Sequence, residues 1–350
     1  MRGAIYEEFG SPLSVRVLPD PTPVPGGAVL RVEATGLCLS DWHGWKGHDP
    51  DIVLPHVPGH ELSGVVEAVG GEVATFRIGA RVTLPFVCGC GRCPQCLSGN
   101  HQVCDHQFQP GFSAWGSFAE YVAIDHADTN LVCLPEEIDH VTAALLGCRF
   151  VTAYRALRHQ GRLAAGEWVA VHGCGGVGLS AVMIAAAFGA RVVAVDLDED
   201  KLALARSVGA EATLNASGHP DVGAGVAALS EGGAHLSIDA FGSATTCLNS
   251  VASLRKRGRH VQVGLVPRSE NQPRIPVGRV VAEELEILGS HGMQAHRYEE
   301  LFEFILEGRL DPSRLIQSTV DLTEGARLLT RMDRFEGVGV TVIDAFGPPA

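Results

Sequence analysis

The sequence predicts an α/β protein made of a β-rich domain and a second domain built on a doubly wound parallel sheet. Three observations support this fold class. Short apolar runs broken by Gly, Pro and Asp fill the chain up to about residue 150. Beyond it, apolar runs of strand length alternate with segments of helix length, as in βαβ units. The 350 residues also exceed the size at which one hydrophobic core usually stops growing.

Residues 1–151 are assigned to the β-rich domain. Strands are expected at Ala28–Val32, Gly64–Val69 and Arg81–Leu84, because each is a short apolar run bounded by turn residues. The segment Pro19–Pro25 is expected to be an exposed, extended connector, since proline fixes the backbone and lacks an N–H donor.

Residues 152–289 are assigned to the parallel-sheet domain. Its expected strands are Trp168–His172, Arg191–Asp196, a run ending at Asp239, and His260–Gly264, and its expected helices are Gly176–Gly189, Asp198–Val208 and Ala244–Lys256. Residues 290–350 are expected to return to the first domain. This tail contains helices at Arg297–Glu307 and Glu324–Met332 and a closing strand at Val338–Ile343.

The charge balance of 27 basic and 40 acidic residues gives a formal net charge of −13. Such a surface repels phosphate backbones and anionic lipids, so neither nucleic acid nor membrane is an expected partner. The first residues lack the order of a signal peptide, and the apolar stretch Leu179–Phe188 is about half of the ~20 residues that span a bilayer. A cytoplasmic protein is therefore expected, in which ten reduced cysteines favour metal binding over disulfides.

A glycine-rich turn lies between an expected strand and an expected helix. Its sequence is Gly173-Cys174-Gly175-Gly176-Val177-Gly178, which matches the fingerprint of a dinucleotide-binding turn. Asp196 ends the next strand, 18 residues after the last glycine, where ribose hydroxyls are bound. The carboxylate would repel a 2′-phosphate, which favours NAD over NADP. The alternative is a glycine-rich turn without a ligand.

Four cysteines with the spacing C-x2-C-x2-C-x7-C match a closed tetrahedral zinc site in one short loop. They are Cys90, Cys93, Cys96 and Cys104. Cys88 lies just before the loop and does not fit the spacing. The alternative is a set of unliganded thiols.

Three further residues could form an open catalytic zinc site, although their spacing alone does not reveal it. Cys38 lies in a Cys-Leu-Ser-Asp-Trp-His segment, His60 in Pro-Gly-His-Glu, and Cys148 in Gly-Cys-Arg-Phe-Val-Thr. Each also has a structural explanation: a thiol can pack as a small hydrophobe, and a histidine can be a hydrogen-bonded core residue. Ser40 and His43 are candidates for a proton path near Cys38, or for simple turn-capping residues.

Taken in this order, the motifs resemble the zinc-dependent alcohol dehydrogenases of the medium-chain dehydrogenase/reductase superfamily, along essentially the whole chain. The resemblance implies a GroES-like catalytic domain, a Rossmann domain and two zinc ions per chain. It assigns the catalytic zinc to Cys38, His60 and Cys148, and the structural zinc to the four-cysteine loop. It also places Glu61 near the catalytic metal and Asp41 behind His60, as the residue that orients the imidazole.

The resemblance further implies the reaction and the cofactor contacts. An alcohol ionised at zinc would pass a hydride to NAD while its proton leaves through Ser40 and His43; in reverse, an aldehyde or ketone would be reduced. The expected substrate is a small primary or secondary alcohol, and the short loop between Cys104 and Trp115 favours a homotetramer over a dimer. The additional residues expected to contact the cofactor are Thr152, Lys201, Gly264, Leu265 and Val266.

The sequence departs from the family pattern at two positions. Leu39 stands where a basic residue usually contacts the pyrophosphate, and Val340 stands where an arginine often follows the glycine of the closing strand. Two other functions remain open: a zinc-independent quinone or enone reductase, and a non-enzymatic dinucleotide-binding protein. The candidates for the wall of a substrate pocket are Trp42, Trp45, His48, Phe86, Phe112 and Trp115.

Overall fold

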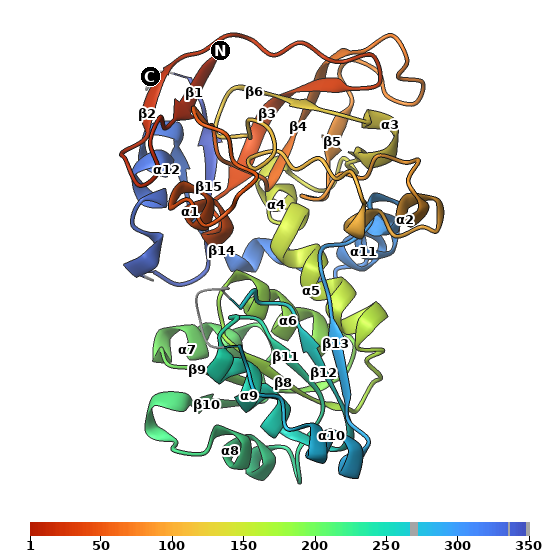
Figure 1. Cartoon of the computed structure of the whole chain (residues 1–350), viewed down its shortest axis with the longest axis vertical. Coiled ribbons are helices and arrows are strands. Elements are labelled where there is room, and N and C mark those ends of the chain that lie inside the picture. The colour runs from red at the N-terminus through yellow and green to blue at the C-terminus, as the bar shows by residue number, and fades with distance from the viewer. Residues whose placement is uncertain (267–271, 335–336, 348–350) are drawn as a thin grey trace. The chain divides into compact units, whose positions relative to one another are not determined.

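The computed structural model describes residues 1–266, 272–334 and 337–347, and the chain forms two compact units (Figure 1). Unit 1 comprises Met1–Val151, Gly292–Glu307 and Ile316–Ala350, and unit 2 comprises Thr152–His291 and Gly308–Leu315. Although residues 290–350 were expected in the first domain, residues 290–291 lie in unit 2, and so does the short segment Gly308–Leu315. It is held in unit 2 by Arg314, whose guanidinium donates a hydrogen bond to the carbonyl oxygen of Ser207.

Unit 1 is organised around a seven-stranded, mainly antiparallel sheet with the path β14-β15-β3-β4-β5-β7, and β6 also pairs with β3. The strands are β3 (Ala28–Gly36), β4 (Leu62–Val69), β5 (Arg81–Thr83), β6 (Tyr121–Ile124), β7 (Val132–Cys133), β14 (Ile316–Asp321) and β15 (Val340–Ala345). Only β14 and β15 pair in parallel. The central strand β3 is largely buried along its length and contributes Leu30 and Val32 to the main hydrophobic core of this unit.

Short strands and helices complete unit 1. The antiparallel pair β1 (Arg2–Ile5) and β2 (Ser14–Val17) lies outside the main sheet. The helices are α1 (Leu39–Trp45), α2 (Pro94–Leu97), α3 (Ala127–Asn130), α4 (His140–Ala144), α11 (Tyr298–Leu306) and α12 (Leu322–Leu329). α4 and α12 begin at Asp139 and Asp321, whose carboxylates accept backbone N–H hydrogen bonds, as aspartate commonly does at a helix start. A π-helical turn, Leu146–Phe150, follows α4 and leads into α5 (Val151–Arg155).

Unit 2 contains a six-stranded sheet in which all neighbouring strands are parallel, in the order β10-β9-β8-β11-β12-β13. The strands are β8 (Trp168–His172), β9 (Arg191–Asp196), β10 (Ala212–Asn215), β11 (Ala234–Asp239), β12 (Leu254–Gln262) and β13 (Glu286–Gly289). Numbered along the chain, this is the order 3-2-1-4-5-6 of a doubly wound sheet, which confirms the predicted fold class. Ligands of such sheets bind at the carboxyl ends of the strands, at the point between β8 and β11 where the strand order reverses.

The helices of unit 2 are α6 (Gly176–Ala187), α7 (Glu199–Ser207), α8 (Val222–Leu229), α9 (Ala244–Ala252) and α10 (Val277–Glu283). The predicted helix Ala244–Lys256 is wrong at its end. α9 stops at Ala252, and β12 begins at Leu254, where the sequence predicted a strand only from His260. Leu254 pairs with Ala234 of β11 and packs its side chain into a small core cluster, so tertiary contacts extend the strand backwards. Within the described residues, no helix is both long and apolar enough to cross a bilayer.

Candidate active site and metal centres

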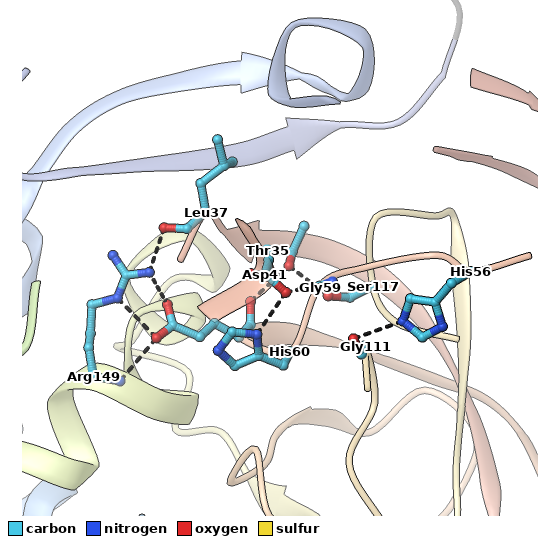
Figure 2. Close-up of polar contacts among 10 residues, drawn as sticks. Thr35, Leu37, Asp41, His56, Gly59, His60, Gly111, Ser117 and Arg149 are labelled. Atoms are coloured by element: carbon cyan, nitrogen blue, oxygen red, sulfur yellow. Dashed lines mark hydrogen bonds and ion pairs between the residues drawn. The ribbon is translucent and has the colours of Figure 1, made fainter. Parts of the chain in front are cut away.

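A buried aspartate–histidine pair lies where β3 ends and α1 begins. Asp41 is in the first turn of α1, and its Oδ1 accepts hydrogen bonds from the backbone N–H of Gly59 at 2.9 Å and from Nδ1 of His60 at 2.8 Å (Figure 2). In the neutral imidazole this contact places the proton on Nδ1 and leaves the lone pair on Nε2. Asp41 and His60 are each 1% exposed, so this tautomer is fixed by protein groups.

A buried ion pair between Glu61 and Arg149 lies beside it. Oε1 of Glu61 accepts hydrogen bonds from the backbone N–H and Nε of Arg149, both at 3.0 Å, and Oε2 pairs with the same guanidinium. The guanidinium also donates to the carbonyl oxygen of Leu37 at 2.7 Å. Burial raises the pKa of Glu61, whereas the positive charge of Arg149 acts in the opposite direction. Sequence reasoning missed Arg149, because its partner is 88 residues away and no local spacing connects them.

Four potential ligands meet next to this network. Cys38 lies just before α1, His60 and Glu61 just before β4, and Cys148 in the π-helical turn, and their ligand atoms lie within 4.8 Å of one another. A hydrogen bond from Cys148 lowers the pKa of Cys38 although burial opposes it, so one thiolate is favoured. Burial lowers the pKa of His60, but the Asp41 carboxylate and the Cys38 sulfur together outweigh this effect and raise it. Two sulfurs and one oriented imidazole suit zinc.

Ser40 and His43 lie three residues apart in α1, on one face of the helix. Nδ1 of His43 is 3.0 Å from Nδ1 of His48, so one of these two nitrogens carries the proton of a shared hydrogen bond. Burial lowers the pKa of His43, and the neighbouring His48 acts in the same direction. His43 is therefore neutral at neutral pH and able to accept a proton.

Four of the six residues proposed for the pocket wall lie beside His60 or His43. Phe86 and Phe112 face the ring of His60, with ring centroids 6.1 and 5.2 Å away. Trp42 meets His43 edge-on at 5.0 Å, and His48 is the hydrogen-bond partner of the same histidine. Trp45 belongs to a small core cluster that also contains Phe112, and Trp115 donates its indole N–H to the carbonyl oxygen of Pro55.

The four cysteines of the loop form a second cluster. Cys90, Cys93, Cys96 and Cys104 are buried, and their sulfurs lie within 4.8 Å of one another. Backbone N–H groups of Cys90 and Cys96 point at the sulfurs of Cys104 and Cys93, at 3.3 and 3.4 Å. The N–H of Cys96 is the main cause that lowers the pKa of Cys93 to about 6. Four converging sulfurs, with amides that favour thiolates, suit a closed zinc site.

Cys88 lies outside this cluster. It is fully buried and donates to the carbonyl oxygen of Pro85, and burial raises its pKa. The loop is instead anchored by Asn130, whose side chain accepts a hydrogen bond from the N–H of Gly89 at 2.7 Å and donates to its carbonyl oxygen at 3.0 Å. Sequence reasoning missed Asn130, because an isolated asparagine carries no spacing signal.

The glycine-rich turn joins β8 to α6. Gly173 has a positive φ of 91°, and a Cβ at Gly178 would lie 1.7 Å from the carbonyl oxygen of Gly173, so both positions require glycine. A Cβ at Gly175 would meet nothing within 4 Å, so the space above this residue is open. Gly176 and Val177 form the first turn of α6, which has no side-chain cap. The helix start therefore offers free backbone N–H groups to an anion.

Asp196 is held rigidly at the end of β9. Its Oδ2 accepts a hydrogen bond from the N–H of Cys174 at 2.6 Å, and its Oδ1 accepts from the N–H groups of Leu197 and Asp198 at 2.8 and 3.1 Å. The carboxylate thus ties the glycine-rich turn to the following loop. Lys201 lies in the first turn of α7, capped by Asp198.

The remaining cofactor candidates lie on other segments. Gly264 follows β12, and a Cβ there would lie 2.3 Å from the backbone nitrogen of Gly242, so the two loops touch through their backbones. Buried Asp239 orders this region by accepting hydrogen bonds from the N–H groups of Phe241 and Gly242, and sequence reasoning missed it.

Leu265 is 80% exposed and Val266 is half-buried. Thr152 lies in α5, with no hydrogen-bond partner for its buried hydroxyl among the described residues.

Comparison with known proteins then identifies the family. The sequence profile described as "Alcohol dehydrogenase GroES-like domain" matches residues 24–136, and "Zinc-binding dehydrogenase" matches residues 176–307. An alcohol dehydrogenase of Geobacillus stearothermophilus is 36% identical over 312 residues, which are 89% of this chain and 90% of that protein. The chain belongs to the zinc-binding alcohol dehydrogenase family of the medium-chain superfamily. Its two units correspond to the GroES-like and Rossmann folds of that family.

Other alcohol dehydrogenases are similar to this chain along most or all of its length. An alcohol dehydrogenase of Rhizobium meliloti (strain 1021) is 36% identical over 89% of both chains. The crystal structure of the alcohol dehydrogenase TADH from Thermus sp. ATN1 has a TM-score of 0.90 at 30% identity and covers 99% of this chain and 100% of its own. A structure described as an NAD-dependent alcohol dehydrogenase has a TM-score of 0.88 at 32% identity, with 99% and 100% coverage.

Replacing Arg149 should test the buried ion pair. We expect Arg149→Met to lower the free energy of unfolding by about 3–5 kcal/mol, because it leaves the Glu61 carboxylate buried without its partner. The loss should shrink as the pH falls, since a buried Glu61 without Arg149 has a still higher pKa and folds more readily when protonated. Urea denaturation at neutral and mildly acidic pH measures both effects.

Arg16→Met is the matched control, because Arg16 pairs with Glu7 on the surface. Exposed pairs contribute about 0–1 kcal/mol. Equal losses in the two variants, or a loss independent of pH, would contradict a structural role for the Glu61–Arg149 pair.

Proposed function

We propose that this protein is a zinc-dependent, NAD-linked alcohol dehydrogenase that acts on a small primary or secondary alcohol and, in reverse, on an aldehyde or ketone. The observation that carries the proposal is the convergence of Cys38, His60 and Cys148 in unit 1. Three protein ligands leave a coordination position for substrate, as in catalytic zinc sites. The four-thiol loop offers no such position, which fits a structural ion.

Zinc would supply Lewis-acid polarisation of the alcohol, and NAD would supply the hydride acceptor. The chain's own residues set the conditions for this chemistry. Asp41 fixes the tautomer of His60, so that Nε2 is free to bind metal. Glu61 lies beside these three ligands, and Arg149 binds both of its carboxylate oxygens and offsets its charge.

Ser40 and His43 would carry the substrate proton to solvent. Neutral His43 can accept a proton, and its hydrogen bond to His48 holds the ring in place. Phe86 and Phe112 beside His60 would form an apolar wall for the alkyl part of the alcohol. We also infer a homotetramer, because the loop between Cys104 and Trp115 is short, and a cytoplasmic protein in which the cysteines are reduced and bind metal.

NAD would bind in unit 2 at the turn formed by residues 173–178, with its pyrophosphate at the start of α6. Asp196 would accept hydrogen bonds from the ribose hydroxyls, and no arginine stands beside it at positions 197 and 198. The further proposed contacts are Thr152, Lys201, Gly264, Leu265 and Val266. A relative described as a zinc-binding dehydrogenase of Sinorhizobium meliloti 1021 has NADP bound, so the preference for NAD depends on Asp196 of this chain.

Metal analysis should find two zinc ions per chain with different lability. Cys148→Ser should remove the catalytic ion and the activity, and Cys93→Ser should remove the structural ion and destabilise the loop. Cys88→Ser is the matched control and should keep both ions, since Cys88 lies outside both clusters. Brief chelation should abolish activity while most of the fold is retained. A fully active enzyme with one zinc per chain would overturn the assignment.

The cofactor prediction is tested by following NADH formation with a panel of primary and secondary alcohols. We expect NAD to be preferred over NADP by about 10²-fold or more in kcat/KM, because Asp196 would repel a 2′-phosphate. Equal efficiency with both cofactors would contradict the role of Asp196. No turnover with any alcohol, in the zinc-loaded protein, would favour a non-enzymatic binding protein.

Two glycine variants test whether NAD binds at the turn formed by residues 173–178. Gly175→Ala should weaken NAD binding with little change in melting temperature, because its Cβ meets no protein atom but occupies the space over the turn. Gly178→Ala should lower the melting temperature itself, since its Cβ would clash with Gly173.

His43→Ala should slow alcohol oxidation by about 10²-fold, the lower end for loss of a positioned proton acceptor. The effect should be largest below neutral pH, where hydroxide and basic buffer that could replace the imidazole are scarce. Exogenous imidazole should restore part of the rate. The control is His219→Ala, which removes an exposed histidine from unit 2. An unchanged pH–rate profile in His43→Ala would reduce His43 to a structural residue.

A further inference from the structure

Strand β12 contains an irregularity that gathers positive charge. Leu254 pairs with Ala234 of β11, and the next pair is Arg259 with Leu236. Four residues of β12, at positions 255–258, therefore lie opposite the single residue His235. Their sequence is Arg-Lys-Arg-Gly, so three consecutive cationic side chains leave the regular ladder at one point.

This bulge opens onto a cleft of about 670 Å³ in unit 2. The cleft is lined by Arg162, Glu167, His235, Arg255, Lys256, Arg257, Arg259, Glu284 and Glu286. It thus carries five Lys or Arg side chains against three Glu, on a protein whose formal net charge is −13. The bulge and Glu286 are near the amino ends of β12 and β13, whereas the glycine-rich turn follows the carboxyl end of β8 (Figure 1).

The three glutamates are already paired with arginines. Glu167 pairs with Arg259 at 2.5 Å, and both side chains are largely buried. Glu286 pairs with Arg162 at 2.5 Å, and Glu284 lies 3.6 Å from Arg257 in a fully solvated contact. Arg255 and Lys256 have no carboxylate partner among the residues that the structure describes.

His235 faces two hydrogen-bond donors. The backbone N–H of Trp168 points at its Nδ1 from 3.0 Å, and the guanidinium of Arg255 lies 2.8 Å from its Nε2. A neutral imidazole has one N–H and one acceptor nitrogen, so it cannot accept both hydrogen bonds. If Nδ1 accepts from Trp168, Nε2 carries a proton that faces the N–H of Arg255. Protonation would add a second N–H and no acceptor, so it cannot resolve the conflict at any pH.

An oxygen atom at this point could accept hydrogen bonds from both the Nε2–H of His235 and the guanidinium of Arg255. We propose that the cleft is a binding site for a multivalent oxyanion of the phosphate type, held by Arg255, Lys256 and the Nε2–H of His235. Hydrogen bonds from cationic donors to a phosphate oxygen are short and strong, and a planar guanidinium fits this geometry. The free ion and the phosphate group of a small phosphate monoester share this chemistry, and the cleft volume admits either.

The test uses the zinc-loaded protein saturated with NADH, so that the glycine-rich turn is occupied. Inorganic phosphate is titrated by isothermal calorimetry at constant ionic strength, with sodium chloride as the balancing salt. We expect one saturable phosphate per chain. Lys256→Gln and Arg255→Gln should each weaken binding at least tenfold, whereas Arg16→Gln, which removes one exposed charge from unit 1, should not.

Lys256 is exposed and makes no ion pair with the residues that the structure describes, so Lys256→Gln should fold as the wild type does, and its melting temperature verifies this. Glycerol 3-phosphate, titrated in parallel, identifies the source of the phosphate. Tighter binding of the monoester supports a phosphorylated metabolite as ligand, and tighter binding of inorganic phosphate supports the free ion. Heat that does not saturate, or an affinity unchanged in folded Lys256→Gln, would overturn the proposal.

Discussion

The need to satisfy buried charges organises unit 1 around its candidate metal site. Glu61 and Arg149 are both buried, and a buried carboxylate without a partner costs several kcal/mol. Arg149 can meet Glu61 and the carbonyl oxygen of Leu37 at once only if the end of β3, the segment before β4 and the π-helical turn come together. These three segments carry Cys38, His60 and Cys148. The residues that would hold a catalytic metal are thus positioned by an ion pair that does not itself need the metal.

The parts of the site that sequence reasoning found are those whose geometry is local. The four cysteines lie within one loop, and the turn at residues 173–178 is held by its own glycines, so spacing alone indicates both. Cys38, His60 and Cys148 could be grouped only through a family resemblance, because the fold brings them together. Arg149, Asn130 and Asp239 were missed for the same reason. Each acts through hydrogen bonds to backbone or side chains that are defined only in the folded chain.

The fold shows the same division. The predicted strands Trp168–His172 and Arg191–Asp196 agree with β8 and β9 residue by residue, because buried parallel strands are short, continuous apolar runs. The boundary between α9 and β12 was wrong, because Arg255, Lys256 and Arg257 have good helix propensity. Pairing of Leu254 with Ala234 overrides that preference. The cationic bulge is therefore a place where local propensity and tertiary structure disagree, and such disagreements often mark functional sites.

The two ends of the parallel sheet offer an anion different kinds of donor. At the carboxyl ends, the turn before α6 presents backbone N–H groups. These donors carry no net charge, so salt screens their interaction with an anion only weakly. At the amino ends, the bulge of β12 presents the side chains of Arg255 and Lys256, whose attraction for an anion weakens as salt screens them. A dinucleotide held mainly by amides and by Asp196 should therefore bind with little dependence on ionic strength. A phosphate in the cleft should instead be sensitive to salt, so ionic strength alone separates the two sites on one sheet.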